Sequence, residues 1–163
     1  MHGAVLIDTQ DKPLRPCILW NDGRSQEQCE TLSSLANFEA ITGNLVMPGF
    51  TAPKIKWVEE NEPHIFSKIH KVLLPKDYVR LWLTGTYATD LSDASGTLWL
   101  NVSKRDWSDT LLEATGLSRA HMPDLYEGNA VTGVLRKQLA QRFGMANVIV
   151  VWGWWSLTKA LLA

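Results

Sequence analysis

The densest group of chemically useful side chains lies between residues 20 and 24. An aromatic ring, an amide, a carboxylate and a guanidinium occur there in the order Trp20, Asn21, Asp22, Gly23 and Arg24. At a turn from a strand into a helix, such groups can converge on a small polyol. The alternative is structural, with the polar residues capping the next helix and Trp20 packed against it. The residues alone leave both interpretations open.

Histidine supplies the next candidates. His2 stands just before an apolar run, where an imidazole can hydrogen-bond a substrate, and the alternative is a frayed terminus. The other three histidines, His64, His70 and His121, lie among polar residues and show no metal-ligand spacing. We therefore predict that these three are ordinary surface residues and that the chain has no metal site.

Two further groups carry weaker signals. Asp90, Ser92 and Asp93 can ligate a substrate, but Asp and Ser close together more often form the hydrogen bonds of turns. Lys54 and Trp57 are three residues apart, which predicts a packed Trp beside a Lys whose ammonium group reaches solvent. The sequence contains neither the Walker-type motif GxxxxGK(S/T) nor the dinucleotide-binding motif GxGxxG, so it shows no nucleotide site.

These residues need elements to position them. Apolar runs between turn residues predict strands over 4–7, 17–20, 72–74 and 147–151, and the first two are expected to pair with each other. Apolar periodicity and capping residues predict helices over 24–38, 54–61, 63–69, 75–83, 108–114 and 135–143, with a loop over 87–99. Alternating strands and helices favour an α/β layered architecture.

Composition narrows the function classes. The 163 residues predict about one domain, and a net charge of −1 gives no positive field for nucleic acid or an anionic membrane. Cys17 and Cys29 have no metal-ligand spacing, and no apolar run is long enough to span a membrane. We therefore expect a cytoplasmic protein whose partner is a small molecule or another protein.

Several motifs together resemble one enzyme family. Residues 49–61, GFTAPKIKWVEEN, are similar to the first signature of the FGGY carbohydrate kinases. Other motifs resemble the bacterial xylulokinases of that family and occur in the same order, namely MHG at 1–3, ILWNDGR at 18–24, ITGN at 41–44, LPKDY at 74–78 and SDASGT at 92–97. The resemblance extends from Met1 to about Val151.

The resemblance implies a fold, a reaction and a binding site. It implies an α/β chain that is part of a ribonuclease H-like (actin-like ATPase) domain, incomplete at both ends. The implied reaction moves the γ-phosphoryl of ATP, with Mg²⁺, onto the 5-hydroxyl of D-xylulose or a related ketose. The implied substrate-binding residues are Met1, His2, Trp20, Asn21, Asp22 and Arg24.

The chain also departs from the family pattern. The strand predicted over 147–151 should lead into a Gly-rich turn that carries the Asp acting as base, but here the turn reads WGWWSL over 152–157. The base then falls on or near Ser156, whose hydroxyl is a poor proton acceptor. A one-base slip in a run of GGT codons gives TGG, the Trp codon, so we hypothesise a frameshift, which sequencing the gene would test.

These departures shape what the chain alone is expected to do. We predict that residues 1–151 are part of the sugar-side lobe, that 152–163 form an atypical Trp-rich tail, and that no catalytic residue is present. The chain alone is expected to be inactive, to bind no cofactor, to need the remainder of the kinase, and to self-associate through exposed sheet edges. The alternatives are another FGGY pentulose or polyol kinase, or a non-catalytic sugar-binding or interaction protein that uses its Trp cluster.

Overall fold

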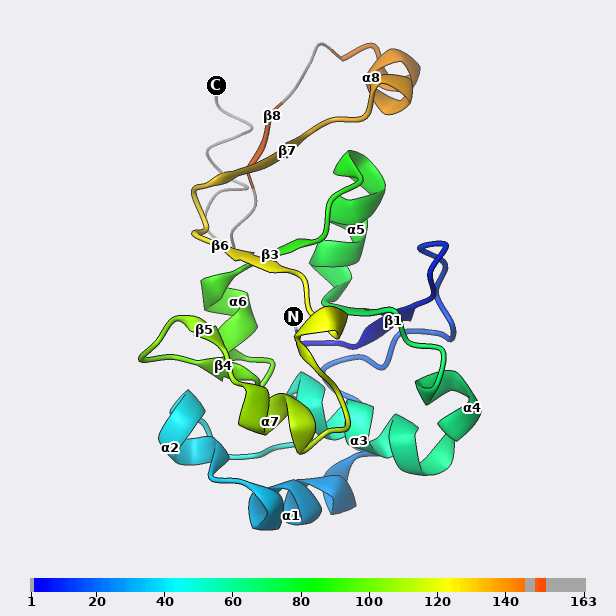
Figure 1. The fold of residues 1–163 in the computed structure, drawn as a ribbon. Helices are drawn as coiled ribbons and strands as arrows, with labels where there is room; N and C mark the ends of the chain where they lie inside the picture. Colours follow the sequence, from blue (N-terminus) through cyan, green and yellow to red (C-terminus); the bar gives the residue numbers. More distant parts are fainter. Residues whose placement is uncertain (1, 146–148, 152–163) are drawn as a thin grey trace.

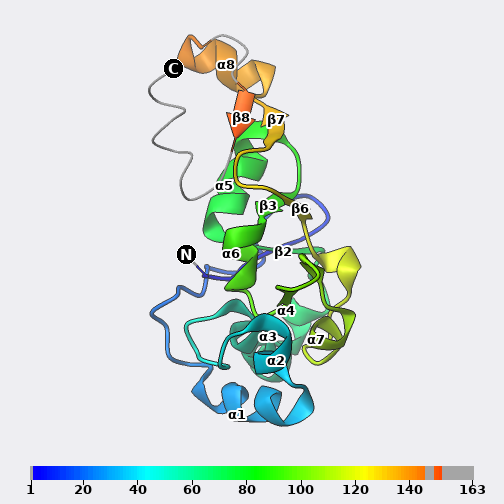
Figure 2. The ribbon, with the colours of Figure 1, turned by 90° about the vertical axis from the view of Figure 1, so that its left-hand side faces the viewer.

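The computed structural model describes residues 2–145 and 149–151, which form short helices and strands, with four helices in succession between β1 and β2. Figure 1 places α1 to α4 at one end of the molecule and α8 with β7 and β8 at the other, and Figure 2 shows the same order after a quarter turn. The helices are α1 (Gln26–Leu35), α2 (Phe38–Thr42), α3 (Thr51–Asn61), α4 (Pro63–Phe66), α5 (Pro75–Thr84), α6 (Leu91–Ser95), α7 (Asp109–Glu113) and α8 (Lys137–Phe143), with a 3₁₀ helix at Arg119–His121. The strands are β1 (Val5–Ile7), β2 (Lys71–Leu73), β3 (Ala88–Asp90), β4 (Leu100–Asn101), β5 (Asp106–Trp107), β6 (Asp124–Tyr126), β7 (Val131–Val134) and β8 (Ile149–Val151).

The described strands pair in four two-stranded sheets. Strands β1 and β2 are antiparallel, with Val5 opposite Leu73, and β3 and β6 are parallel. The pairs β4–β5 and β7–β8 are antiparallel. Because β1 pairs with a strand from beyond α4, distant parts of the chain meet at the N-terminal strand.

Of the two strands predicted over 4–7 and 17–20, only the first forms, as β1, and their pairing is reduced to a single antiparallel bridge. The second segment forms no strand and contributes one bridge, in which Ala4 and Ile18 exchange two backbone hydrogen bonds of 2.9 and 3.2 Å. Proline lacks the N–H that a strand needs for pairing, and Pro13 and Pro16 precede this bridge. The segment 17–20 therefore crosses β1 briefly and continues toward α1.

Strand β1 separates two apolar cores. Leu6 packs into the larger core with residues such as Phe38 and Trp99, whereas Val5 and Ile7 pack into a smaller core. Successive side chains of a strand point to opposite faces, so a strand buried on both faces has no polar positions. This explains the uninterrupted apolar run over 4–7.

Most helix predictions are confirmed, with shifted ends. Gly85 ends α5 in the left-handed conformation at φ 83°, as its position after the apolar pattern predicts. The helix predicted over 24–38 divides into α1 and α2, and Leu35, the last residue of α1, is 55% exposed. The helix predicted over 63–69 ends at Phe66, and the strand predicted over 147–151 is described only from Ile149.

The loop predicted over 87–99 is wrong. This stretch contains β3 and α6, and the Asp90 side chain caps α6 by accepting a 3.0 Å hydrogen bond from the backbone N–H of Asp93. Residues that favour turns also favour helix caps, because the same side-chain oxygens accept backbone N–H groups in both. None of the described helices is long and apolar enough to span a membrane.

Candidate functional site

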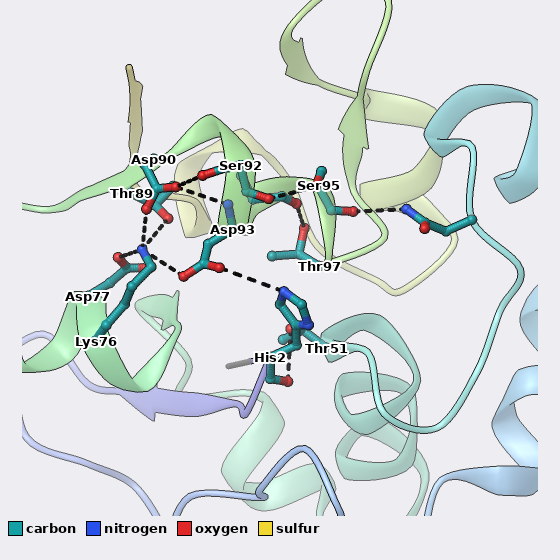
Figure 3. A network of polar contacts seen from close by, with 12 residues as sticks. His2, Thr51, Lys76, Asp77, Thr89, Asp90, Ser92, Asp93, Ser95 and Thr97 are labelled. Carbon is teal, nitrogen blue, oxygen red and sulfur yellow. Dashed lines mark hydrogen bonds and ion pairs between the residues drawn. The ribbon is translucent and has the colours of Figure 1, made fainter. Parts of the chain in front are cut away.

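A half-buried lysine, Lys76, contacts three carboxylates where β3, α5 and α6 meet (Figure 3). Lys76 Nζ lies 2.5 Å from Asp77 Oδ1, 2.8 Å from Asp90 Oδ1 and 3.5 Å from Asp93 Oδ2, and it donates a hydrogen bond of 3.3 Å to Thr89 Oγ1. Asp77 and Asp90 are each 1% exposed. Three buried carboxylates therefore share one ammonium group.

The charges in this cluster follow from burial and pairing. Burial alone lowers the pKa of Lys76, but the Asp77 and Asp90 carboxylates outweigh it and raise that pKa above its ordinary value. Burial raises the pKa of Asp90, but its hydrogen bond to Lys76 wins and lowers the net value. Burial dominates at Asp77 and raises its pKa to about 6. Lys76 and Asp90 thus form the charged pair, and Asp77 is the carboxyl that takes up a proton first.

His2 lies at the edge of this cluster. Its Nε2 is 4.0 Å from Asp93 Oδ1, and its side chain is 29% exposed. Its ring faces Phe50 with centroids 5.8 Å apart, and its backbone carbonyl accepts a 3.2 Å hydrogen bond from Thr51 Oγ1. The imidazole is therefore held beside Asp93 and Phe50, with part of its surface accessible.

Lys54 holds the loop that carries Phe50. Its ammonium group donates to the carbonyls of Pro48 and Phe50 at 2.6 and 2.7 Å. The side chain is fully buried, and that burial lowers its pKa to about 8. The prediction that this ammonium reaches solvent is therefore wrong. Side chains on a helix lean toward its N-terminus, and here the carbonyls just before α3 provide the partners that water was expected to supply.

The turn at 20–24 is held by its own side chains. Arg24 donates to both carboxylate oxygens of Asp22, at 2.9 and 2.7 Å, and this pairing lowers the pKa of Asp22 to about 2. The guanidinium also lies 4.8 Å from the ring centroid of Trp57 on α3, within the range of a cation–π contact. The Asp22–Arg24 pair therefore attaches this turn to α3.

The alternative interpretation of this turn, in which its polar residues cap α1 and Trp20 packs against that helix, is wrong. Trp20 is 59% exposed rather than packed, and the residue that precedes α1 is Ser25, whose side chain makes no cap hydrogen bond. A Cβ built on Gly49 would lie 3.5 Å from the Trp20 carbonyl oxygen. Gly49 therefore approaches the backbone of Trp20, and the next two residues, Phe50 and Thr51, contact His2, so this segment links the start of the 20–24 turn to His2. Met1 lies outside the described residues.

The remaining candidates have structural roles. Asp90 and Ser92 are bonded to each other, and Asp90 caps α6, so the turn-type interpretation of this group is confirmed for these two. His64 is exposed, whereas His70 and His121 are half-buried, and His121 Nδ1 accepts a 3.0 Å hydrogen bond from the Ser118 N–H. Across 2–145 and 149–151, no group of three or more His, Cys, Asp or Glu is arranged to hold a metal ion.

A family model agrees with the motif resemblance. The model described as the FGGY family of carbohydrate kinases, N-terminal domain, matches residues 1–162. The chain belongs to the FGGY family. Kinases of this family use ATP and a metal ion in the intact enzyme, and the α/β fold is that of the actin-like ATPase domain, as the sequence predicts.

Individual relatives of this FGGY chain are sugar kinases. It is 58% identical over 154 residues to the xylulose kinase of Escherichia coli and 55% identical to that of Klebsiella pneumoniae, which covers 94% of the chain and 32% of each relative. A crystal structure of a xyloylose kinase from Brucella ovis superimposes with a TM-score of 0.91 at 55% identity, over 94% of this chain and 32% of that one. The chain thus spans about a third of the length of the relatives it matches.

Sequence reasoning missed four residues around the FGGY candidate site. Lys76 and Asp77 belong to the LPKDY motif, yet nothing local shows that their partners lie on β3 and α6. Phe50 lies in the first signature, but its contact with His2 depends on tertiary structure. Gly96 reads as a turn glycine in SDASGT, and only the fold shows that His2 packs on it. The signal in the sequence was that the LPKDY and SDASGT motifs place charged residues among apolar ones, which indicates buried charges.

Proposed function

We propose that the intact protein is an ATP-dependent sugar kinase that transfers the γ-phosphoryl group to the 5-hydroxyl of D-xylulose. The observation that carries this proposal is the 58% identity to a xylulose kinase over nearly the whole of the described chain. In this proposal, residues 1–151 are part of the sugar-side lobe and residues 152–163 are an atypical tail. Both the activity and the substrate are proposed for the intact protein, because this chain spans only about a third of the length of that relative.

The proposed sugar contacts are those that the family resemblance implies, namely Met1, His2, Trp20, Asn21, Asp22 and Arg24. An imidazole ring can both donate to and accept from hydroxyls, and an exposed indole face can pack on the C–H surface of a sugar. Arg24 already donates two hydrogen bonds to Asp22, and this pair orients the turn. Only the lone pairs and N–H groups that are not used in this pair can bind a ligand.

The described residues do not fit an ATP or Mg²⁺ site. The carboxylates of Asp77, Asp90 and Asp93 are already paired with the ammonium group of Lys76, and no cluster in the described ranges is arranged to hold a metal ion. We therefore assign no phosphoryl-transfer step to this chain. Its proposed contribution is to bind and orient the ketose that receives the phosphoryl group.

The test combines sugar binding with kinetics. Thermal-shift titrations of the chain with D-xylulose, D-ribulose, L-ribulose and glycerol measure which sugar it prefers, and we expect the largest shift with D-xylulose. Kinetics require a chimera in which residues 1–145 replace the matching segment of the Escherichia coli relative. If another ketose or glycerol gives the largest shift, the proposed substrate is wrong, but the proposed kinase activity still stands.

The decisive variant is His2→Ala in that chimera. Leaving a sugar hydroxyl unpaired costs about 1–3 kcal/mol, and 1.4 kcal/mol is a factor of ten, so the KM for D-xylulose should rise roughly ten-fold. The KM for ATP should stay nearly constant. His64→Ala, an exposed histidine on α4, is the matched control. An unchanged KM for D-xylulose in a variant with a native circular dichroism spectrum would remove His2 from the site.

A further inference from the structure

The His2 imidazole packs directly on the backbone of Gly96. A Cβ built on Gly96 would lie 2.1 Å from His2 Nε2 and 2.2 Å from Cε1, closer than any real contact. The backbone of Gly96 has φ −85° and ψ 6°, a conformation that every residue type adopts. Glycine is therefore needed at this position for the close approach of the ring and not for backbone freedom.

Two more residues complete the surroundings of the ring. Phe50 lies across from it at 5.8 Å, tilted by 46°, and Asp93 points its Oδ1 at Nε2 from 4.0 Å. We call these three residues, Phe50, Asp93 and Gly96, the His2 slot. Asp93 and Gly96 both come from the segment of α6 and its C-cap, so one rigid element supplies two sides of the slot.

Lys76 fixes the orientation of the carboxylate in the slot. Its Nζ lies 3.5 Å from Asp93 Oδ2, while Oδ1 of the same carboxylate faces His2. Figure 3 shows the three side chains in a row, with the second ring nitrogen of His2 turned away from Asp93. A carboxylate beside Nε2 favours the tautomer that carries its proton there, and Nδ1 is then a hydrogen-bond acceptor.

We propose that Asp93 and Gly96 are positioning residues that hold the His2 imidazole in the orientation, and the Nε2–H tautomer, in which Nδ1 accepts a hydrogen bond from a sugar hydroxyl. This inference rests on the proposed role of His2 as a sugar contact. Neither residue touches the sugar in this arrangement. Gly96 leaves room for the ring, and Asp93 sets which nitrogen carries the proton.

Kinetics of the chimera test the inference through a double-mutant cycle. Gly96→Ala introduces a methyl group where the ring lies, so the ring must swing away and the KM for D-xylulose should rise at least five-fold. The kcat and the KM for ATP should change by less than two-fold. In the His2→Ala background the collision is gone, so adding Gly96→Ala should change the KM by less than two-fold. Ser95→Ala, whose hydroxyl bonds the Ser92 carbonyl, is the matched control on the same helix.

Asp93→Asn tests the tautomer in the 163-residue chain itself. Nitrogen-15 spectra of the His2 ring distinguish a protonated from an unprotonated ring nitrogen, and we expect Nε2–H in the wild type and a mixture of tautomers in the variant. The same spectra give the pKa of His2. Burial lowers this pKa, the positive charges of the N-terminal amine, Lys54 and Lys76 lower it further, and the Asp93 carboxylate raises it. Asp93→Asn should lower it again.

The outcomes separate this inference from the proposed function. If His2→Ala leaves the KM for D-xylulose unchanged, the site assignment fails and the positioning role fails with it. If His2→Ala raises the KM but Gly96→Ala does not, His2 binds sugar without the slot and only the inference is overturned. An Asp93→Asn variant with unchanged ring-nitrogen shifts overturns the role of Asp93. A Gly96→Ala defect that is equally large in the His2→Ala background overturns the role of Gly96.

Discussion

Replacing Lys76 with methionine removes the ammonium group that Asp77, Asp90 and Asp93 share. Breaking a buried ion pair from one side costs about 3–5 kcal/mol, because the other charge stays buried without its partner. One kcal/mol shifts the melting temperature of a domain of this size by about 2–4 °C, so the variant should melt roughly 6–20 °C lower at pH 7. Circular dichroism melting curves measure the difference.

The dependence on pH identifies the cause of that loss. In the wild type, burial raises the pKa of Asp77 from 3.8 to about 6, so the folded state binds this proton more tightly than the unfolded state. This contribution to stability is present below pH 4 and is lost as the pH rises through 6. Without Lys76 the carboxylates take up protons more readily, so the deficit of Lys76→Met should shrink between pH 7 and pH 5.

Two further variants control for packing and for the number of carboxylates. Lys71→Met removes an ammonium group that donates to the carbonyls of Ala120 and Met122, at 2.8 and 2.9 Å, and its deficit should be equal at pH 5 and pH 7. Asp77→Asn removes one buried carboxylate, so it should melt no lower than the wild type at pH 7. A Lys76→Met curve that overlays the wild type at pH 7, or a deficit of the same size at both pH values, would refute the reasoning.

Three other outcomes are expected. Arg80→Met removes the hydrogen bonds that the guanidinium donates to Thr132 Oγ1 and to the Thr86 carbonyl, each worth about 1.5–3 kcal/mol because the donor is charged, so amide exchange in β7 should accelerate; unchanged protection there would contradict this. Trp99→Phe loses the 3.0 Å hydrogen bond from Nε1 to Thr115 and should cost about 1–3 kcal/mol in urea unfolding, which an unchanged midpoint would exclude. The chain alone should not phosphorylate D-xylulose with ATP in a coupled assay, and turnover that survives repurification would count against that expectation.

Local signals predicted the helices well. Helix α5 begins at Pro75 and ends before Gly85. Proline favours the first turn of a helix and glycine the left-handed position after its last turn, so both ends can be read from the residue types alone. The family motifs likewise predicted the fold class, because they occur in register along the chain. Position along the sequence is sufficient for features of this kind.

Contacts between distant segments were not predictable from position. The partner of β1 is β2, and no pattern in either strand names the other. Lys54 was expected in water because nothing in the sequence shows that two carbonyls fold back over it. The role of Gly96 depends on a ring more than ninety positions earlier in the chain, so it emerges only when both are placed. The candidate site was therefore predicted as a set of residues and not as an arrangement.

The position of β1 between two cores has a consequence for how the chain folds during synthesis. Strand β1 leaves the ribosome well before its partner β2, which follows only after α1, α2, α3 and α4 have been made. Until then, Leu6 lacks much of its core and Val5 and Ile7 lack theirs, so the apolar N-terminal strand stays exposed while four helices emerge. Closing that long loop has an entropic cost that is recovered only when β1 and β2 pair. The contact of His2 with Gly96 forms only after α6 has been made, so the geometry of the His2 slot depends on chain synthesised more than ninety residues later.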